Sequence, residues 1–403
     1  MSDFFQSGTV ATFHRLGEFS LEKLEKDLLE FSFKKGITLV LPSLYSEIQG
    51  EGLRKIVEEL KGVRYLREIV LTLGPASKKQ FLEVKKFFSG LPQRINVLWN
   101  DGPRLQRLYD ELKDNDLDPG PAGKGRQAWM AYGYVLAERG SRVIVLHDCD
   151  ILTYSRELLG RLVYPVACTK LDYEFCKGYY SRVSDRMYGR VTRLFVTPLI
   201  RALFNVVGYK EILRYFDSFR YILAGELSMT TELASINRIP ADWGLEIGVL
   251  AEVYRNCSPQ RICQAELCKN YEHKHQELSA DDKMKGLNKM TIDIAKTMFR
   301  ILASEGVVYS YGFFNTLRAA YQKIAENMIG RYHGDAMING LEYDLHEEEY
   351  ALEVFVKAIQ TAAEIIIEDP MGPPQIPNWS RVFSAIPDFD HKLLQAVRQD
   401  NSP

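Results

Sequence analysis

The feature that most constrains the fold of this chain is an alternation of short apolar, β-rich runs with segments of helical spacing. Strands that alternate with helices favour a parallel sheet that is covered by helices on both faces. We therefore predict an α/β fold built on a doubly wound, mostly parallel sheet. The runs that we expect to form its strands are Ile37–Leu41, Ile69–Leu73, Ile95–Trp99 and Val143–His147.

Turn or polar residues follow each of these predicted strands. The carboxyl ends of parallel strands meet at one edge of a sheet, and ligands of doubly wound folds bind at that edge. We therefore expect four groups of residues to converge on one binding site: Pro42–Ser43, Thr72–Gly74, Asn100–Asp101 and Asp148–Asp150.

Outside this alternation the patterns change. Leucines at helical spacing after a capping Ser20 predict a helix near the N-terminus. Strands are expected within 164–182, a helix over 190–206, and a Glu-rich turn at 345–349 between long C-terminal helices. The 403 residues then divide into a helical N-terminal extension, an α/β domain in two parts, and a mostly helical C-terminal region, with the bounds 1–35, 36–165, 166–280 and 281–403.

Charge and cysteine content narrow the function classes. The 51 Lys and Arg residues nearly balance the 53 Asp and Glu residues, so a net charge of −2 gives no general attraction to nucleic acid or an anionic membrane. No apolar run approaches the about eighteen residues of a spanning helix, and the start of the chain lacks a signal-peptide pattern. Six cysteines without a CxxC pair indicate neither a disulfide framework nor a zinc site, so we expect a cytoplasmic protein.

Two motifs near the fourth predicted strand suit a phosphorylated ligand. Asp148 and Asp150 flank one residue directly after the strand, where their carboxylates can face a divalent cation, although such residues also serve as simple turn aspartates. The glycines of Gly123–Lys124–Gly125 allow close backbone approach to a phosphate and Lys124 adds a charge. The alternative for this motif is a flexible loop that ends at a helix start.

Three further groups carry chemistry in the second half of the chain. Gly189–Thr192 offers backbone amides, a hydroxyl and the Arg190 guanidinium at a helix start, which is an anion site unless the helix is merely amphipathic with Arg190 in solvent. Glu246 stands in an apolar setting, either as a functional acid or as a helix N-terminal glutamate. His273 lies in a polar cluster and is either a metal ligand or a surface histidine.

The order of these motifs along 36–277 resembles the glucosyl-3-phosphoglycerate synthases and related mannosyl-3-phosphoglycerate synthases of glycosyltransferase family 81. The motifs are Gly-Lys-Gly, the Asp-x-Asp pair, Gly189–Thr192, Ala224–Glu226, Gly244–Gly248 and Glu272–His273. The resemblance implies a GT-A type fold, in which 36–165 binds a nucleotide sugar and 166–280 binds the acceptor. It also implies transfer with retention of the anomeric configuration.

The resemblance further implies roles for individual residues. Asp150 and His273 are expected to hold Mg²⁺ or Mn²⁺, and Asp150, Glu246 and Lys124 to act in catalysis. Lys177 and Tyr179 lie where the family lines the sugar pocket. The expected acceptor residues are Gly189, Arg190, Thr192 and His275. The expected donor residues are Pro42, Ser43, Leu44, Glu47, Gly74, Lys124, Asp148, Cys149, Leu223, Gly225 and Glu246.

The function implied is transfer of glucose, preferentially from UDP-glucose, to the 2-hydroxyl of 3-phosphoglycerate for compatible-solute synthesis, by a homodimer with no nucleic-acid or membrane partner. Alternatives are a mannosyl transferase that uses GDP-mannose and a non-catalytic sugar-nucleotide binder. Departures from the family pattern at Tyr45–Ser46 and Thr72–Gly74 leave the donor base open. A nucleotidyltransferase is disfavoured because Pro42–Tyr45 is not its Gly-rich loop, and a phosphatase because Ile151–Leu152 follows the aspartates.

Overall fold

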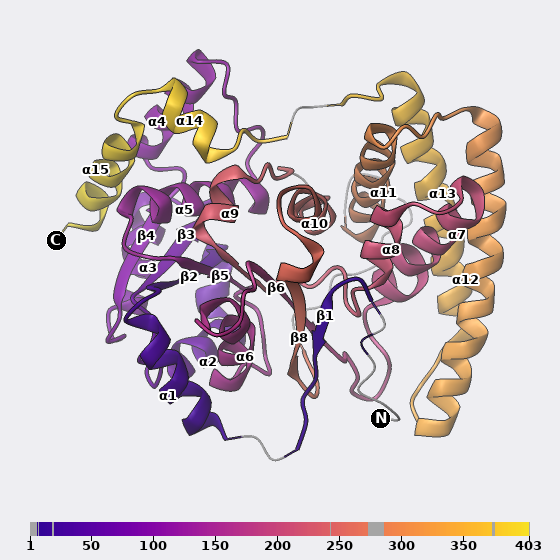
Figure 1. Cartoon of the computed structure of the whole chain (residues 1–403), viewed down its shortest axis with the longest axis horizontal. Coiled ribbons are helices and arrows are strands. Elements are labelled where there is room, and N and C mark those ends of the chain that lie inside the picture. The colour runs from indigo at the N-terminus through magenta and orange to yellow at the C-terminus, as the bar shows by residue number, and fades with distance from the viewer. Residues whose placement is uncertain are drawn as a thin grey trace.

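The structure is a computed structural model that describes residues 6, 8–17, 20–241, 243–272, 286–372 and 375–402. Within these residues one eight-stranded sheet has the order β1-β8-β6-β7-β5-β2-β3-β4 (Figure 1). Its strands are β1 (Ala11–Phe13), β2 (Ile37–Ser43), β3 (Glu68–Leu73), β4 (Arg94–Trp99), β5 (Val143–Leu146), β6 (Phe175–Tyr180), β7 (Leu227–Thr230) and β8 (Ile262–Cys268).

Helices cover the sheet and extend beyond it. In the α/β part they are α1 (Leu21–Ser32), α2 (Glu51–Leu60), α3 (Lys78–Phe88), α4 (Pro103–Asp114), α5 (Lys124–Glu138), α6 (Arg156–Ala167), α9 (Thr231–Ile236) and α10 (Leu245–Asn256). The others are α7 (Thr197–Val207), α8 (Glu211–Asp217), α11 (Gly286–Ser304), α12 (Tyr311–Asn339), α13 (Leu345–Glu368), α14 (Trp379–Ala385) and α15 (Phe389–Asn401).

The sheet confirms the predicted α/β class. β2 pairs in parallel with β3 and β5, β3 pairs in parallel with β4, and only β7, among the described strands, runs antiparallel to its neighbours. Ser43 pairs with Leu73, and Leu73 pairs with Trp99, so the carboxyl ends of β2, β3 and β4 lie level. The predicted convergence of strand ends is therefore present.

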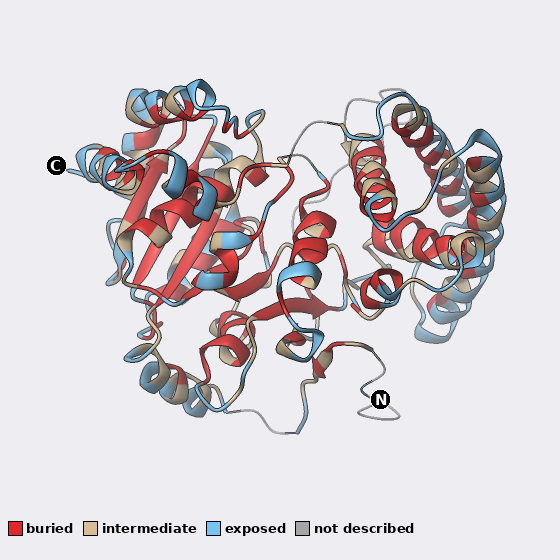
Figure 2. Ribbon diagram, turned by 45° about the horizontal axis from the view of Figure 1, so that its top comes forward, coloured by how far each residue is buried: buried red, intermediate tan, exposed pale blue. Residues whose placement is uncertain are grey.

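Alternating side chains of the strands pack into two hydrophobic cores, one on each face of the sheet. Val40 and Val70 belong to a core with α4, α5 and α10, whereas Leu39 and Leu71 belong to a core with α2, α3 and α6. Figure 2 shows the buried sheet between helices whose outer surfaces are exposed. This three-layer packing makes the carboxyl edge of the sheet a rigid base for a site.

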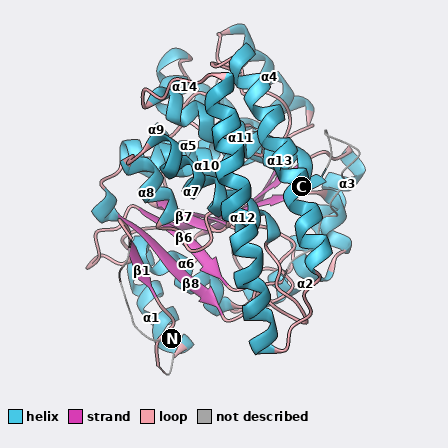
Figure 3. Cartoon of the chain, turned by 90° about the vertical axis from the view of Figure 1, so that its right-hand side faces the viewer, coloured by secondary structure: helices cyan, strands magenta, loops and turns pink. Residues whose placement is uncertain are grey.

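A helical unit of α7, α8, α11, α12 and α13 stands beside the sheet, and α12 is its longest helix (Figure 3). The chain then returns to the sheet, where α15 packs on α4, α5 and β4. The indole of Trp379 in α14 stacks on that of Trp129 in α5 at 4.1 Å between ring centroids. The predicted C-terminal region thus divides between two places in the fold.

Three local expectations need correction. The N-terminal extension holds not only the helix capped by Ser20 but also β1, which pairs with β8 at the edge of the sheet. The region expected to contain strands from 164 is helical to Ala167 before β6 begins. The Glu-rich segment is the first turn of α13, because Asp344 caps that helix by accepting from the Glu347 amide.

Candidate active site

Three predicted site residues meet at the carboxyl edge of the sheet. Lys124 begins α5, Asp148 follows β5, and Glu246 lies in the first turn of α10. The Lys124 Nζ lies 2.6 Å from Asp148 Oδ1 and 3.5 Å from Glu246 Oε1. The Lys124 side chain is 32% exposed, so this group of residues borders solvent.

The backbone at Gly225 closes one side of this group. A Cβ atom at that position would lie 2.7 Å from Asp148 Oδ2 and 3.1 Å from Lys124 Nζ. Any larger residue would therefore displace the ion pair. The half-buried Leu223 and the buried Ala224 precede Gly225, so the stretch predicted to lie under the sugar does border Lys124 and Asp148.

The charges of the site are strongly coupled. Enclosure by the protein opposes the charge of Lys124, but Asp148 and then Glu246 outweigh it and raise the pKa of the amine. Lys124 is therefore protonated at neutral pH and can interact with a diphosphate. Burial raises the pKa of the Cys149 thiol well above its ordinary value, so Cys149 is a neutral group between the two aspartates.

The start of α2 packs tightly on the Asp-x-Asp loop. A Cβ at Gly52 would lie 2.8 Å from the Asp150 carbonyl carbon. Ser43, the last residue of β2, is buried, whereas the next residue, Leu44, is 50% exposed. Pro42 and Glu47 are half-buried on the same stretch, and Ser43 and Glu47 interact with Cys149 between the two aspartates.

The loop after Asp150 is bonded to the segment that precedes His273. Leu152 N donates to Glu272 O at 2.8 Å, and Glu272 N donates to Thr153 Oγ1 at 3.0 Å. His273 and His275 themselves lie outside the described residues. No group of three or more His, Cys, Asp or Glu side chains placed to hold a metal occurs among the residues that the structure describes.

A buried layer of charged groups lies behind the ion pair. Lys177 in β6 is buried and its Nζ donates to Ala224 O at 2.6 Å. Burial lowers the pKa of Lys177 to about 8, although Glu246 and Glu226 act in the opposite direction. Lys177 thus fixes the backbone next to Gly225. Tyr179, by contrast, bonds to His14 rather than to residues of the site.

Glu226 is the buried acid that sequence reasoning left without a role. Its carboxylate accepts from the Tyr180 hydroxyl at 2.7 Å and from the Tyr271 hydroxyl at 2.5 Å. Burial raises its pKa, and Asp148 adds to that effect. Its position directly before the four-residue strand β7 could not be predicted, because Leu227–Thr230 is too short and mixed for a distinct strand pattern.

Three predicted acceptor residues, Gly189, Arg190 and Thr192, lie at the border with the helical unit. Gly189 has a φ of 74°, which favours glycine, and Val191–Val196 form a π-helical turn ahead of α7. The buried Thr192 Oγ1 has no hydrogen-bond partner among the described residues. Arg190 is not free in solvent, since it is ion-paired with Glu347 and Glu348 of α13.

The glycines beside Lys124 and the polar residues at the ends of β3 and β4 have structural roles. Gly123 and Gly125 accommodate the segment Pro240–Ala241, because a Cβ at Gly125 would lie 2.2 Å from Pro240 O. Thr72 and Asn100 are buried and bond to each other at 2.8 Å, so their side chains support the strand ends from within. Gly74 shares this edge, and its carbonyl accepts from Gln127.

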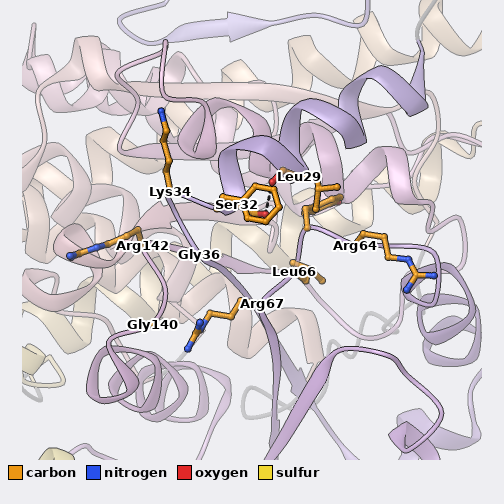
Figure 4. A pocket seen from close by; sticks show the side chains of 11 residues that line it. Leu29, Ser32, Lys34, Gly36, Arg64, Leu66, Arg67, Gly140 and Arg142 are labelled. Carbon is orange, nitrogen blue, oxygen red and sulfur yellow. Dashed lines mark hydrogen bonds between the residues drawn. The ribbon is translucent and has the colours of Figure 1, made fainter.

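A separate pocket of about 320 Å³ lies at the opposite, amino-terminal edge of the strands (Figure 4). Four basic residues line it: Lys34, Arg64, Arg67 and Arg142. Their side chains extend in different directions in Figure 4 and do not converge on one point. This pocket is remote from the aspartates and is not the site described above.

The mostly parallel sheet, the strand-end aspartates and the paired lysine together define an α/β glycosyltransferase. No family model matches the chain. A glucosyl-3-phosphoglycerate synthase from Persephonella marina is 49% identical over 402 residues, which is 100% of both chains. A second, from Methanococcoides burtonii, is 39% identical over 405 residues and covers 99% of this chain and 98% of its own. The chain therefore belongs to the glucosyl-3-phosphoglycerate synthase family and is an enzyme.

Solved structures agree on the fold. Glucosyl-3-phosphoglycerate synthase from Mycobacterium tuberculosis, in complex with Mn²⁺, UDP-glucose and phosphoglyceric acid, matches with a TM-score of 0.53 at 18% identity. That match covers 75% of this chain and 90% of the other. The same enzyme with Mg²⁺ and UDP matches with a TM-score of 0.52 at 19% identity, over 75% and 88%. In the part of the chain that the structure describes, none of the helices has the length and apolar character needed to cross a bilayer.

Proposed function

We propose that this enzyme transfers glucose from UDP-glucose to the 2-hydroxyl of 3-phosphoglycerate with retention, and that the product serves compatible-solute synthesis. The observation that carries the proposal is the contact of Lys124 with Asp148 and Glu246 above Gly225. The family of the chain and the ligands named for the Mycobacterium tuberculosis enzyme support it.

The residues present fit a divalent cation, Mg²⁺ or Mn²⁺. Asp148 and Asp150 supply hard oxygen donors, and Gly225 leaves open the space that a Cβ would fill beside Asp148. We assign Asp150 and His273 as ligands; the bonds of Glu272 to Leu152 and Thr153 support this assignment. When bound, such a cation neutralises negative charge that develops on a diphosphate leaving group.

Side chains of this chain then orient the donor. Lys124 exchanges part of its contact with Asp148 for the diphosphate, and Leu44 with the neighbouring Pro42–Ser43 contacts the base. Glu246 accepts from sugar hydroxyls. Asp148 and Glu246 are both ion-paired with Lys124, which favours electrostatic roles over covalent attack. The departing phosphate deprotonates the acceptor hydroxyl on the same face of the sugar.

The acceptor binds on the other side of the transferring sugar. The Gly189 backbone, Arg190 and the Thr192 hydroxyl are assigned to its phosphate, and the buried, unpartnered Thr192 Oγ1 supports this assignment. His275 is assigned to the same phosphate by resemblance alone. A front-face reaction of this kind depends on positioning the two substrates.

A product screen tests the proposal. UDP-glucose and GDP-mannose are each incubated with 3-phosphoglycerate, glycerate or glycerol 3-phosphate, with Mg²⁺ or EDTA, and products are identified by mass spectrometry and their anomeric configuration by NMR. We expect α-linked glucosyl-3-phosphoglycerate, its loss in EDTA, and its recovery with Mg²⁺ or Mn²⁺.

Three outcomes contradict parts of the proposal. A mannosyl product from GDP-mannose would show that the donor is GDP-mannose. Donor binding without any product would show that the chain is a non-catalytic sugar-nucleotide binder. Full turnover in EDTA would show that the reaction needs no metal. If a folded Asp150→Asn variant keeps its turnover, the assignment of Asp150 as a metal ligand is wrong. Light scattering tests the homodimer, and fractionation of the source cells tests the cytoplasmic location.

A further inference from the structure

The segment that carries the proposed acceptor arginine is fastened to the start of α13. Arg190 Nε lies 2.8 Å from Glu348 Oε1, and Arg193 Nη1 lies 3.0 Å from Glu348 Oε2. One carboxylate thus holds two arginines that are three residues apart. These residues are more than 150 positions apart in the chain, so the contact fastens the segment between β6 and α7 to the start of α13.

Glu348 is built into the protein. Its side chain is only 5% exposed, and the Tyr343 hydroxyl lies 3.5 Å from Oε2. Arg193 is held further by the carbonyls of Met187 and Tyr188 and lies over the ring of Tyr332. The carboxylate is therefore fixed in place, and the orientation of Arg190 follows from it.

A second contact fastens the same loop. Glu342 N donates to Asp185 O at 2.8 Å, and Arg186 Nη2 pairs with Glu342 Oε2 at 2.7 Å. The loop ahead of Gly189 thus follows the residues between α12 and α13. Two independent contacts therefore make the helical unit a support for the proposed acceptor site.

Glu347, the neighbour of Glu348, stands in a different environment. Its side chain is 55% exposed, and it contacts Arg190 Nη2 at 3.1 Å. The Nη1 group of Arg190 has no hydrogen bond to the described residues. An anion that approaches Arg190 from solvent therefore meets the exposed Glu347 carboxylate but not the buried Glu348 carboxylate.

We propose that Glu348 is a positioning residue that aims Arg190 at the phosphate of the acceptor, whereas Glu347 is a counter-charge that the phosphate displaces. The inference rests on the proposed function, because it takes Arg190 as the phosphate ligand. It gives the helical unit a role in acceptor selection. Because Glu348 holds the Arg190 guanidinium fixed, less conformational entropy is lost when the phosphate binds. The exposed Glu347 carboxylate opposes binding, because the phosphate has to displace it from Arg190.

Three matched variants near the start of α13 test this division of roles. Glu348→Gln should raise the KM for 3-phosphoglycerate about tenfold, since Arg190 loses its charged anchor. Glu347→Gln should lower that KM roughly two- to fivefold, since an exposed ion pair no longer competes. Glu349→Gln removes the next carboxylate along the chain, which is exposed, and should leave the KM unchanged. The affinity for UDP, measured by calorimetry, should be equal in all three.

A purely structural role for these acids does not predict opposite changes in one substrate's KM. The inference is wrong if Glu348→Gln and Glu347→Gln change the acceptor KM in the same direction, or if UDP affinity falls with it. If Glu348→Gln does not fold, Glu347→Gln alone decides: an unchanged or raised KM overturns the competitor role. Inhibition by inorganic phosphate should become stronger in Glu347→Gln and not in Glu349→Gln.

Arg190→Ala separates this inference from the proposed function. If Arg190→Ala leaves the acceptor KM unchanged, the proposed phosphate site itself is wrong. The other outcome is that Arg190→Ala weakens acceptor binding and narrows the preference for 3-phosphoglycerate over glycerate. If neither glutamate variant then changes the KM, the roles of Glu348 and Glu347 are both wrong and the phosphate site at Arg190 stands.

Discussion

The amine of Lys124 lies 2.6 Å from a carboxylate oxygen of Asp148. This contact joins the first residue of α5 to the Asp-x-Asp loop that follows β5. The amine also faces Glu246, so a single cation lies between two acids. Under the proposed function, Lys124 would exchange part of its contact with Asp148 for phosphate oxygens of the donor. Asp150 and His273 would hold the cation that offsets the charge of the diphosphate.

Replacement of Lys124 by Gln should therefore affect two ligands differently. Loss of a charge-assisted hydrogen bond should weaken UDP-glucose binding about ten- to hundredfold. Mn²⁺ should bind the ligand-free variant at least as tightly as the wild type, because a competing positive charge is gone. Calorimetric titrations of each ligand measure both effects. A parallel loss of Mn²⁺ and UDP-glucose binding would indicate that Lys124 holds the site together structurally.

Gly225 should tolerate no side chain. In Gly225→Ala the new Cβ would lie 2.7 Å from Asp148 Oδ2, so the ion pair has to move and turnover should fall about tenfold or more. Gly90→Ala is the control, because a Cβ there meets no atom within 4 Å and its φ is not positive. Initial rates with saturating substrates measure the effect. Equal rates for the two variants would show that the site is not closed at Gly225.

The parallel half of the sheet could be predicted from the sequence because its strands carry their own signal. β2, β3 and β5 are mostly apolar runs, each followed by a turn, and nearly all of their residues are buried. β4 is buried only at its centre. β1 and β7 span three and four residues and depend on partners far along the chain. Such strands are stabilised by pairing, which a local pattern does not record.

The same distinction applies to the site. Asp148 stands at a strand end that the pattern located, whereas its place in one site with Lys124 and Glu246 was implied by the family resemblance. The pairing of Arg190 with Glu348 depends on how the helical unit docks, and a glutamate in a Glu-rich turn gives no sign of burial. The side chains of Thr72 and Asn100 were expected to face a ligand, yet each satisfies the other.

Glu246 is predicted to act on the sugar rather than on the nucleotide. Glu246→Gln keeps the shape of the side chain but loses the charge, so kcat should fall about ten- to hundredfold while UDP affinity changes little. Steady-state kinetics and UDP titration measure the two quantities. If UDP affinity falls as steeply as kcat, the role of Glu246 is to hold Lys124 in place.

His147 links acid stability to the Asp-x-Asp loop. The imidazole is fully buried at the end of β5, with Nδ1 2.9 Å from Asp148 O and Nε2 3.2 Å from the Tyr154 hydroxyl. Burial lowers its pKa to about 4, from 6.5 in the unfolded chain. Between these values the unfolded state binds the proton and the folded state does not. The free energy of unfolding should therefore fall as pH decreases through this range.

The full shift corresponds to about 3 kcal/mol, lost between about pH 6.5 and pH 4. His147→Gln removes the titrating group, so urea unfolding across this range should show a shallower loss of stability than the wild type, whatever the stability of the variant at pH 7. His391→Gln removes an exposed histidine and should follow the wild-type curve. If the curves of the wild type and His147→Gln stay parallel from pH 6.5 to pH 4.5, His147 does not control acid stability and other groups of the protein do.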